Sequence, residues 1–102
     1  MAAQPTPPNL QQMVIEDINW MAGPNRQADV MKTQNLESIF GLMTYQRRAL
    51  AAPFEETARQ WKADAQLSRS ACEKLGTVGD AVELVSKAAG FDGSWVQGGA
   101  VT

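Results

Sequence analysis

Reactive side chains are scarce in this sequence, which contains no histidine and a single cysteine, Cys72. A hydrolytic or transfer site needs an activated nucleophile with a base beside it, and histidine is the usual base near neutral pH. Glu73 would raise the pKa of the Cys72 thiol and Lys74 would lower it, so neither neighbour marks it as activated. We interpret Cys72 as a buried, unreactive small hydrophobe, and the sequence predicts no catalytic residue and no enzyme.

Two further patterns could suggest chemistry. Glu55 and Glu56 are adjacent, so on a helix they diverge by about 100° and cannot share a substrate. Residues 76–79, Gly-Thr-Val-Gly, lack the Lys-Ser/Thr ending and the preceding strand of a phosphate loop, and a helix break explains them. The carboxylates are scattered and no His/Cys cluster exists, so we expect no metal and no cofactor.

Composition narrows the classes of partner and compartment. The net charge of −2 and pI near 5 argue against a nucleic-acid partner, and the adjacent pair Arg47 and Arg48 is typical of a solvated helix face. One cysteine cannot staple the fold, which indicates a reducing compartment. Residues 1–8 lack the charged start and apolar segment of an export signal, and no apolar run approaches the length of a transmembrane helix. The sequence therefore predicts a cytoplasmic protein without a transmembrane segment.

The apolar residues between positions 36 and 89 recur at steps of three and four, which is the period of a helix with one apolar face. This stripe consists of Leu36, Phe40, Met43, Leu50, Phe54, Ala58, Trp61, Ala65, Cys72, Leu75, Val78, Val82, Val85 and Ala89. The pattern predicts an all-α fold of long amphipathic helices that form a kinked helix, a helical hairpin or a small bundle.

Capping and breaking residues divide the chain. Residues 1–8 carry three prolines and are expected to be disordered, and the glycine-rich residues 91–102 are expected to form a flexible tail. Between them we expect one helical domain over residues 9–90. Its predicted helices span residues 9–21, 27–51, 53–75 and 78–89.

Pro53 is the main ambiguity within this domain. A proline inside a helix costs about 3 kcal/mol, whereas at the first helical position it costs almost nothing. Glu55 and Glu56 follow it and would favour the positive end of a helix dipole. We therefore predict a new helix from Pro53, joined to the preceding one by a kink or a tight turn, with a full reversal as the alternative.

Nine large stripe residues form a predicted binding seam. They are Leu36, Phe40, Met43, Leu50, Phe54, Trp61, Leu75, Val82 and Val85. Other positions of the stripe hold arginine, serine or alanine, so the seam offers little large apolar surface. Self-association or adsorption to an apolar surface would complete its burial. In the alternative, the first helix folds back on the stripe and forms an ordinary small bundle. Trp95 is either a docking anchor in the tail or a residue that packs back onto the bundle.

Two segments resemble a known family. Residues 32–42 read Lys-Thr-Gln-Asn-Leu-Glu-Ser-Ile-Phe-Gly-Leu and are similar to the early segment of phasins, an Asn-x-Glu motif followed by an apolar pair. Residues 75–87, Leu-Gly-Thr-Val-Gly-Asp-Ala-Val-Glu-Leu-Val-Ser-Lys, resemble the phasin break in which a Thr/Ser-led turn opens a helix. The resemblance covers residues 27–90. It implies a small helical protein that coats polyhydroxyalkanoate granules and oligomerises.

The sequence thus predicts a non-enzymatic, phasin-like interaction protein that adsorbs to a polyhydroxyalkanoate granule and forms a homo-oligomer. The alternative is a structural or adaptor subunit of a larger protein assembly, such as a phage or secretion particle, whose partner is another helical protein.

Overall fold

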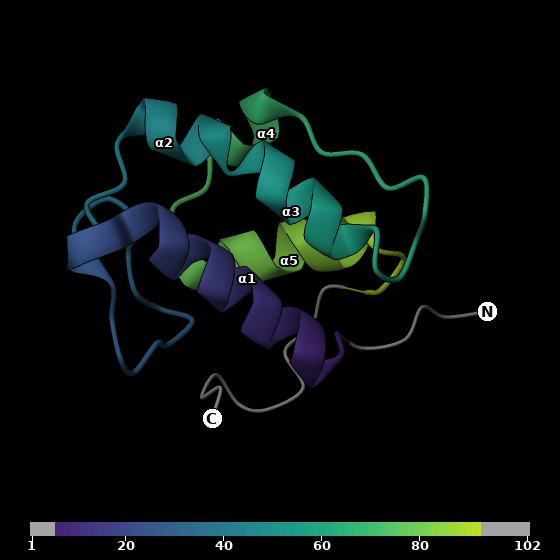
Figure 1. The fold of residues 1–102 in the computed structure, drawn as a ribbon, viewed down its shortest axis with the longest axis horizontal. Helices are drawn as coiled ribbons and strands as arrows, with labels where there is room; N and C mark the ends of the chain where they lie inside the picture. The colour runs from purple at the N-terminus through teal and green to yellow at the C-terminus, as the bar shows by residue number, and fades with distance from the viewer. Residues whose placement is uncertain (1–5, 93–102) are drawn as a thin grey trace.

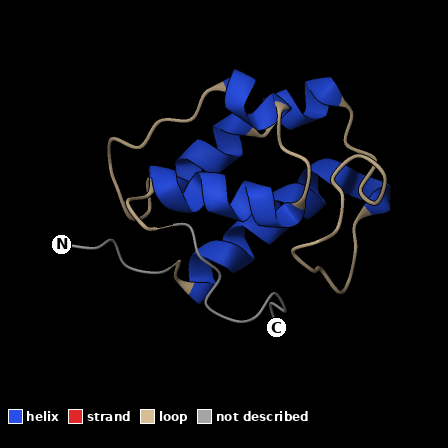
Figure 2. Cartoon of the chain, turned by 180° about the vertical axis from the view of Figure 1, so that it is seen from behind, coloured by secondary structure: helices blue, strands red, loops and turns tan. Residues whose placement is uncertain are grey.

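Five α-helices and a short 3-10 turn make up the regular structure of residues 6–92, the part of the chain that the computed structural model describes (Figure 1). In chain order they are α1 (Pro8–Ala22), η1 (Gly23–Asn25), α2 (Thr44–Ala49), α3 (Ala51–Ala58), α4 (Arg69–Glu73) and α5 (Val78–Ala88). No strand forms within residues 6–92 (Figure 2), and Asn35 and Thr77 form an isolated antiparallel bridge. The predicted all-α class is confirmed.

The first and last helices lie where their caps predict them. The expected helix over residues 9–21 is α1, and Gly23, at φ 57°, ends it by donating its N–H to the carbonyl of Asn19. The expected helix over residues 78–89 is α5. Thr77 Oγ1 accepts from the N–H of Asp80, while Asp80 Oδ2 accepts from the N–H of Thr77, each at 3.2 Å. This reciprocal capping box satisfies two backbone donors and fixes the start of α5.

The predicted helix over residues 27–51 is wrong for most of its length, because residues 26–43 form an irregular segment. Asn35 Oδ1 accepts from the N–H groups of Glu37 and Ser38, both at 2.9 Å, so a side chain replaces the helical acceptor. The backbone of this segment also bonds to the entrance of α5, where Leu36 N–H donates to the carbonyl of Gly76 at 2.9 Å. Local turns and long-range backbone pairing together outweigh the helix propensity of the segment.

Pro53 is the third residue of α3 rather than the first, because α3 begins at Ala51. The first four N–H groups of a helix have no partner within it, so the missing N–H of proline does little harm there. Leu50 joins α2 to α3 in helical conformation, and its N–H donates to the carbonyls of both Gln46 and Arg47. The chain therefore continues from α2 into α3 without reversing, as Figure 1 shows.

The predicted helix over residues 53–75 is also wrong, because α3 ends at Ala58 and α4 begins only at Arg69. Glu55 Oε2 accepts from the N–H of Leu67 at 2.9 Å and thereby holds the intervening loop against α3. Ser68 Oγ then accepts from the N–H of Ala71 at 3.1 Å and caps α4. Both contacts are made by polar side chains, which the 3.6-residue apolar period does not report.

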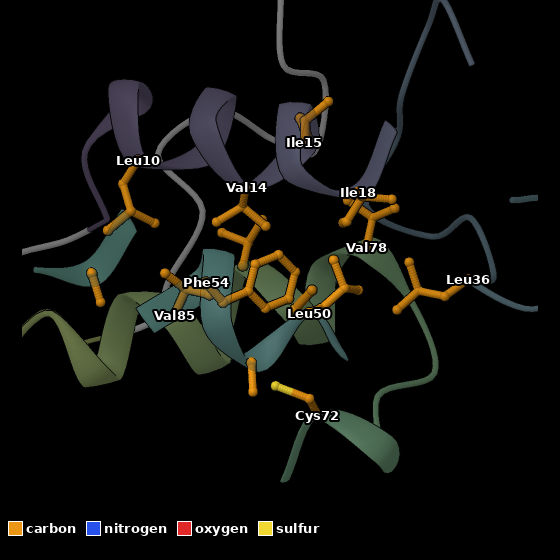
Figure 3. Packing of buried hydrophobic residues seen from close by; sticks show 14 of the residues in the cluster. Leu10, Val14, Ile15, Ile18, Leu36, Leu50, Phe54, Cys72, Val78 and Val85 are labelled. Atoms are coloured by element: carbon orange, nitrogen blue, oxygen red, sulfur yellow. The ribbon is translucent and has the colours of Figure 1, made fainter. Parts of the chain in front are cut away.

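The core lies where α1, α3 and α5 meet (Figure 3). Its largest fully buried hydrophobic side chains are Phe40, Phe54, Leu10, Ile18, Leu36, Leu42, Leu50, Val14, Val78, Val82 and Val85. α1 therefore covers the stripe within one molecule. This corrects the expectation that the stripe is left open. Residues 6–92 instead form the small bundle that the sequence analysis gave as the alternative. No helix of residues 6–92 has the length and hydropathy to cross a bilayer.

The termini of the described part meet at one end of this core. Thr6 and Ser86 are both buried, and their hydroxyl oxygens lie 2.6 Å apart. Thr6 and Pro8 fall within the segment expected to be disordered, but Thr6 is packed and Pro8 begins α1, which corrects that boundary. Phe91 belongs to the segment expected to form a flexible tail, but it packs partly buried against the core, which corrects that boundary as well. Residues 1–5 and 93–102 lie outside the described residues.

Candidate docking groove

The nine predicted seam residues do not form one outer surface. Leu36, Phe40, Leu50, Phe54, Val82 and Val85 are fully buried, and Leu75 is partly buried against them. Met43 is exposed, and the ring of Trp61 packs edge-on against Phe91 with ring centroids 6.3 Å apart. Trp95, the possible tail anchor, lies outside the described residues. The seam is mainly the core of the domain.

The residues that the sequence analysis examined for chemistry have structural roles. Cys72 is fully buried, and burial raises the pKa of its thiol to about 11, which keeps it protonated. In the turn over residues 76–79, the N–H groups of Gly76 and Thr77 both donate to Asp80 Oδ2, where a phosphate loop would hold an anion. Among residues 6–92 no group of three or more histidine, cysteine, aspartate or glutamate side chains is placed to hold a metal ion.

A groove of about 590 Å³ lies between the second half of α1 and the segment that follows η1. We call it the Trp20 groove. Its walls are formed by Gln12, Ile15, Glu16, Asn19, Trp20, Arg26, Gln27, Ala28 and Val30. Its size falls in the range of small-ligand and peptide side-chain pockets, which is about 300–1,000 Å³.

The two walls of the groove are held together by a pair of hydrogen bonds. Asn19 Nδ2 donates to the carbonyl of Gln27 at 3.0 Å, and the N–H of Gln27 donates to Asn19 Oδ1 at 2.9 Å. The side chain thus mimics a strand neighbour and fixes the segment after η1 against α1. A preformed site of this kind loses little conformational entropy when a ligand binds.

The groove has an apolar floor and an exposed aromatic rim. Ile15 and Val30 belong to the floor, at 5% and 7% exposure, whereas Trp20 is 73% exposed. Figure 3 shows the side chain of Ile15 on a different side of α1 from Leu10 and Val14. Tryptophan is enriched among the residues that contribute most to protein interfaces, because it buries a large area and carries an N–H donor. The charged groups Glu16 and Arg26 are also exposed on the groove walls.

Gln11 is an unusual buried polar group of α1 and is not one of the residues that line this groove. It precedes Ile15 by one turn on the same row of α1 and is only 1% exposed. Its amide nitrogen Nε2 is buried and has no hydrogen-bond partner among the described residues. A buried donor of this kind is rare, since leaving one unpaired costs about 1–3 kcal/mol.

A second perturbed group lies on the side of α1 that faces α3. Asp17 Oδ2 accepts from the hydroxyl of Thr57 at 2.7 Å. The pKa of Asp17 is raised from 3.8 to about 6. Burial is the largest cause, the Thr57 hydrogen bond opposes it, and the nearby carboxylates Glu16 and Glu56 add to the rise. No local pattern of residues indicates this pair, because the two residues lie forty positions apart.

The Trp20 groove was also missed at the level of sequence. Trp20 lies off the apolar row of Leu10, Val14 and Ile18 on α1, and a large aromatic residue off that row is the one available signal. No family model, no curated protein and no solved structure matches this chain. The case for a function therefore depends on the site alone.

Proposed function

We propose that this chain is a non-enzymatic interaction domain, a structural or adaptor subunit of a larger protein assembly, which binds its partner through the Trp20 groove. The observation that carries this proposal is a 73% exposed tryptophan beside an apolar floor whose walls are fixed by the Asn19–Gln27 hydrogen bonds. A preformed groove of mixed polarity, with two apolar residues at its base and an exposed aromatic ring at its rim, has features of an interface hot spot.

The groove suggests how a partner would be held. An apolar side chain of the partner would pack on Ile15 and Val30, and the ring of Trp20 would close over it. Glu16 and Arg26 would set the orientation of the partner through charges of opposite sign, more than they would add affinity.

Phasin-like adsorption to a polyhydroxyalkanoate granule remains a prediction, as do homo-oligomerisation and a cytoplasmic location. Adsorption and homo-oligomerisation are both predicted from an open apolar stripe. Six of the nine seam residues are now fully buried, so adsorption through them would require the core to open. We therefore favour the adaptor proposal, and a granule-binding arm in its test separates the two.

The test is site-specific photocrosslinking in the native cell. Benzoylphenylalanine replaces Gln12 on the groove wall, and the matched control carries it at Gln66, which is exposed on another groove. The proposal expects one protein adduct in fixed stoichiometry from position 12, which Trp20→Ala abolishes and Tyr45→Ala, a change at a similarly exposed ring, retains. Equal adducts from both positions, insensitive to Trp20→Ala, would refute it.

The second arm incubates the purified chain with polyhydroxybutyrate particles and pellets them. The adaptor proposal expects the chain in the supernatant. Recovery of the chain in the pellet, together with no adduct from position 12, would favour the granule-coating alternative instead.

A further inference from the structure

We infer that the face formed by α2 and α4 is a second docking surface, which binds a short acidic segment of a partner protein through Arg48 and Arg69. We call it the Arg48 surface. It shares no lining residue with the Trp20 groove, so the inference goes beyond the proposed function and does not depend on it. The occupant is a peptide that presents neighbouring aspartate or glutamate carboxylates.

Positive charge is concentrated on this face, although the chain as a whole is acidic. Residues 44–49 and 69–74 form α2, α4 and the residue after α4. They carry four basic side chains and one acidic side chain, which are Arg47, Arg48, Arg69, Lys74 and Glu73. The rest of the chain carries five basic and ten acidic side chains. A local net charge of +3 beside −5 for the remainder directs an acidic ligand to this face and away from other faces.

Arg47 holds the two helices of this surface together. Its Nε donates to the carbonyl of Glu73 at 3.1 Å, and its Nη1 donates to the carbonyl of Leu42 at 2.7 Å. Both acceptors are backbone oxygens, so one half-buried guanidinium joins the end of α4 to the segment before α2. α2 and α4 pack on each other, apart from α1 (Figure 1). The surface is therefore formed before a ligand arrives, which lowers the entropy cost of binding.

A pocket of about 350 Å³ lies on this surface. It is lined by Tyr45, Arg48, Ala49, Ala52 and Arg69. Arg48 comes from α2 and Arg69 from α4, and both side chains are exposed. The alanines are small and exposed, so they leave room for a ligand side chain beside the two arginines. The volume lies at the lower end of the range for ligand pockets, about 300–1,000 Å³, which suits a short segment.

The two arginines keep donors free for a carboxylate. Arg69 makes no side-chain hydrogen bond or ion pair within residues 6–92. Arg48 Nη1 lies 2.7 Å from Glu73 Oε1, in a pair that is open to solvent. A guanidinium carries five N–H donors in a planar fork, so one bond to Glu73 leaves most of the Arg48 fork available. Arg48 thus already holds the same chemical group that we infer for the ligand.

The distribution of charge favours a short acidic peptide over a nucleic acid. A nucleic acid is a continuous line of phosphates, so its binding needs basic side chains along an extended path. Here the positive face is confined to two short helices, and the rest of the chain is acidic. The planar fork of arginine also matches the two oxygens of a carboxylate, which can be bound by two parallel hydrogen bonds.

The experiment measures binding of a fluorescein-labelled peptide with a run of glutamates to the full chain. Fluorescence anisotropy is recorded at about 20 mM salt, where exposed charges are weakly screened. The inference expects saturable binding of this peptide and none of the same peptide with glutamines. Arg69→Gln should weaken binding by about three- to fivefold, the effect of an exposed ion pair. Arg26→Gln removes an exposed arginine at the Trp20 groove and should leave binding unchanged.

Glu73→Gln separates binding from folding, because its expected effect has the opposite sign. The change frees Arg48 Nη1 and removes the one negative charge of the surface, so the affinity for the glutamate peptide should rise by about two- to threefold. A change that only loosened α4 would lower this affinity. Arg69→Gln should leave the urea midpoint of unfolding unchanged, since Arg69 has no partner within residues 6–92 to lose.

Several results would overturn the inference. They are the absence of peptide binding at low salt, and equal losses of binding with Arg26→Gln and Arg69→Gln. Tighter, Arg69-dependent binding of an oligothymidylate of equal length would assign the surface to nucleic acid instead. Self-association in sedimentation velocity that Arg69→Gln abolishes would assign it to a second copy. Intact peptide binding without a Trp20-dependent adduct from position 12 would remove the proposed function and leave this inference standing.

Discussion

Two grooves of similar size differ in whether the charged groups of their walls are bonded to other parts of the fold. The Trp20 groove measures about 590 Å³, and a groove between α3 and α4 measures about 630 Å³. In the second groove, which we call the Glu55 groove, Glu55 pairs with Arg59 at 3.2 Å and accepts from the N–H of Leu67. Arg59 also donates to the carbonyl of Ala65 at 3.0 Å.

The charged groups of the Glu55 groove thus hold the loop over residues 59–68, and a ligand there would compete with the fold. At the Trp20 groove, Asn19 and Gln27 likewise hold the walls together, whereas the charged groups of Glu16 and Arg26 and the ring of Trp20 are exposed. The comparison teaches that volume does not distinguish a binding groove from a structural one. The distinguishing property is whether the charged and aromatic wall residues are bonded within the fold or exposed.

The largest expected effect comes from a substitution in the core. Phe54 is fully buried on α3, and Phe54→Ala should lower the free energy of unfolding by about 3–5 kcal/mol, because it removes buried area and leaves a cavity. Urea unfolding of the purified chain measures this. A loss below about 1 kcal/mol would mean that Phe54 is not packed inside the monomer.

Trp20→Ala separates recognition from stability. The affinity for the crosslinked partner should fall about 30-fold, equivalent to about 2 kcal/mol, because the rim of the groove is lost. Unfolding free energy should change by less than about 0.5 kcal/mol, since Trp20 is 73% exposed. Titration calorimetry with the partner and urea unfolding supply the two values, with Tyr45→Ala as the control. The reverse result, lost stability with intact affinity, would place Trp20 among structural residues.

Glu55→Ala should show the opposite behaviour. It leaves the N–H of Leu67 without its acceptor and Arg59 without its ion pair, so we expect a loss of about 1–2 kcal/mol in stability and no change in partner affinity. Glu56→Ala, at an exposed neighbour, is the control and should alter stability by less than about 0.5 kcal/mol. Equal effects of the two variants would show that Glu55 does not hold the loop.

Asp17 gives the smallest effect and a dependence on pH. Its pKa is about 6 in the folded chain against 3.8 as its ordinary value, so between about pH 4 and pH 6 the folded state binds more protons than the unfolded state. Stability should therefore fall as pH rises through this window, by about 1 kcal/mol for a half-buried carboxyl. Asp17→Asn retains the acceptor for Thr57 and should flatten this part of a stability–pH curve measured by urea unfolding. A variant with the wild-type slope would assign the titration to another group.

Sequence reasoning reached the elements whose signals are local. The conformation of Gly23, the C-cap, ends α1. The side chain of Thr77, the N-cap, sets the start of α5. The apolar period also identified core residues such as Phe54 and Val85. That period does not reveal whether a residue reaches the core from a helix or from a turn, and Leu36 and Phe40 do so from the irregular segment over residues 26–43.

The candidate site depends on contacts that no local pattern encodes. The Asn19–Gln27 hydrogen bonds close the groove across the turn η1, and only the folded chain brings the two residues together. The Glu55–Leu67 contact that ends the predicted helix over residues 53–75 is of the same kind. Both are polar contacts across a loop, whereas apolar periodicity reports only one face of a continuous element.

Thermal unfolding of the purified chain over a hundredfold range of concentration tests most directly whether the apolar stripe is buried within one molecule. The unfolding midpoint of a monomer is independent of concentration. We expect one cooperative transition with an unchanged midpoint and no binding of a hydrophobic dye beforehand. An unfolding midpoint that rises with concentration, or strong dye binding by the native chain, would show that the apolar stripe is exposed in the monomer and is covered by association.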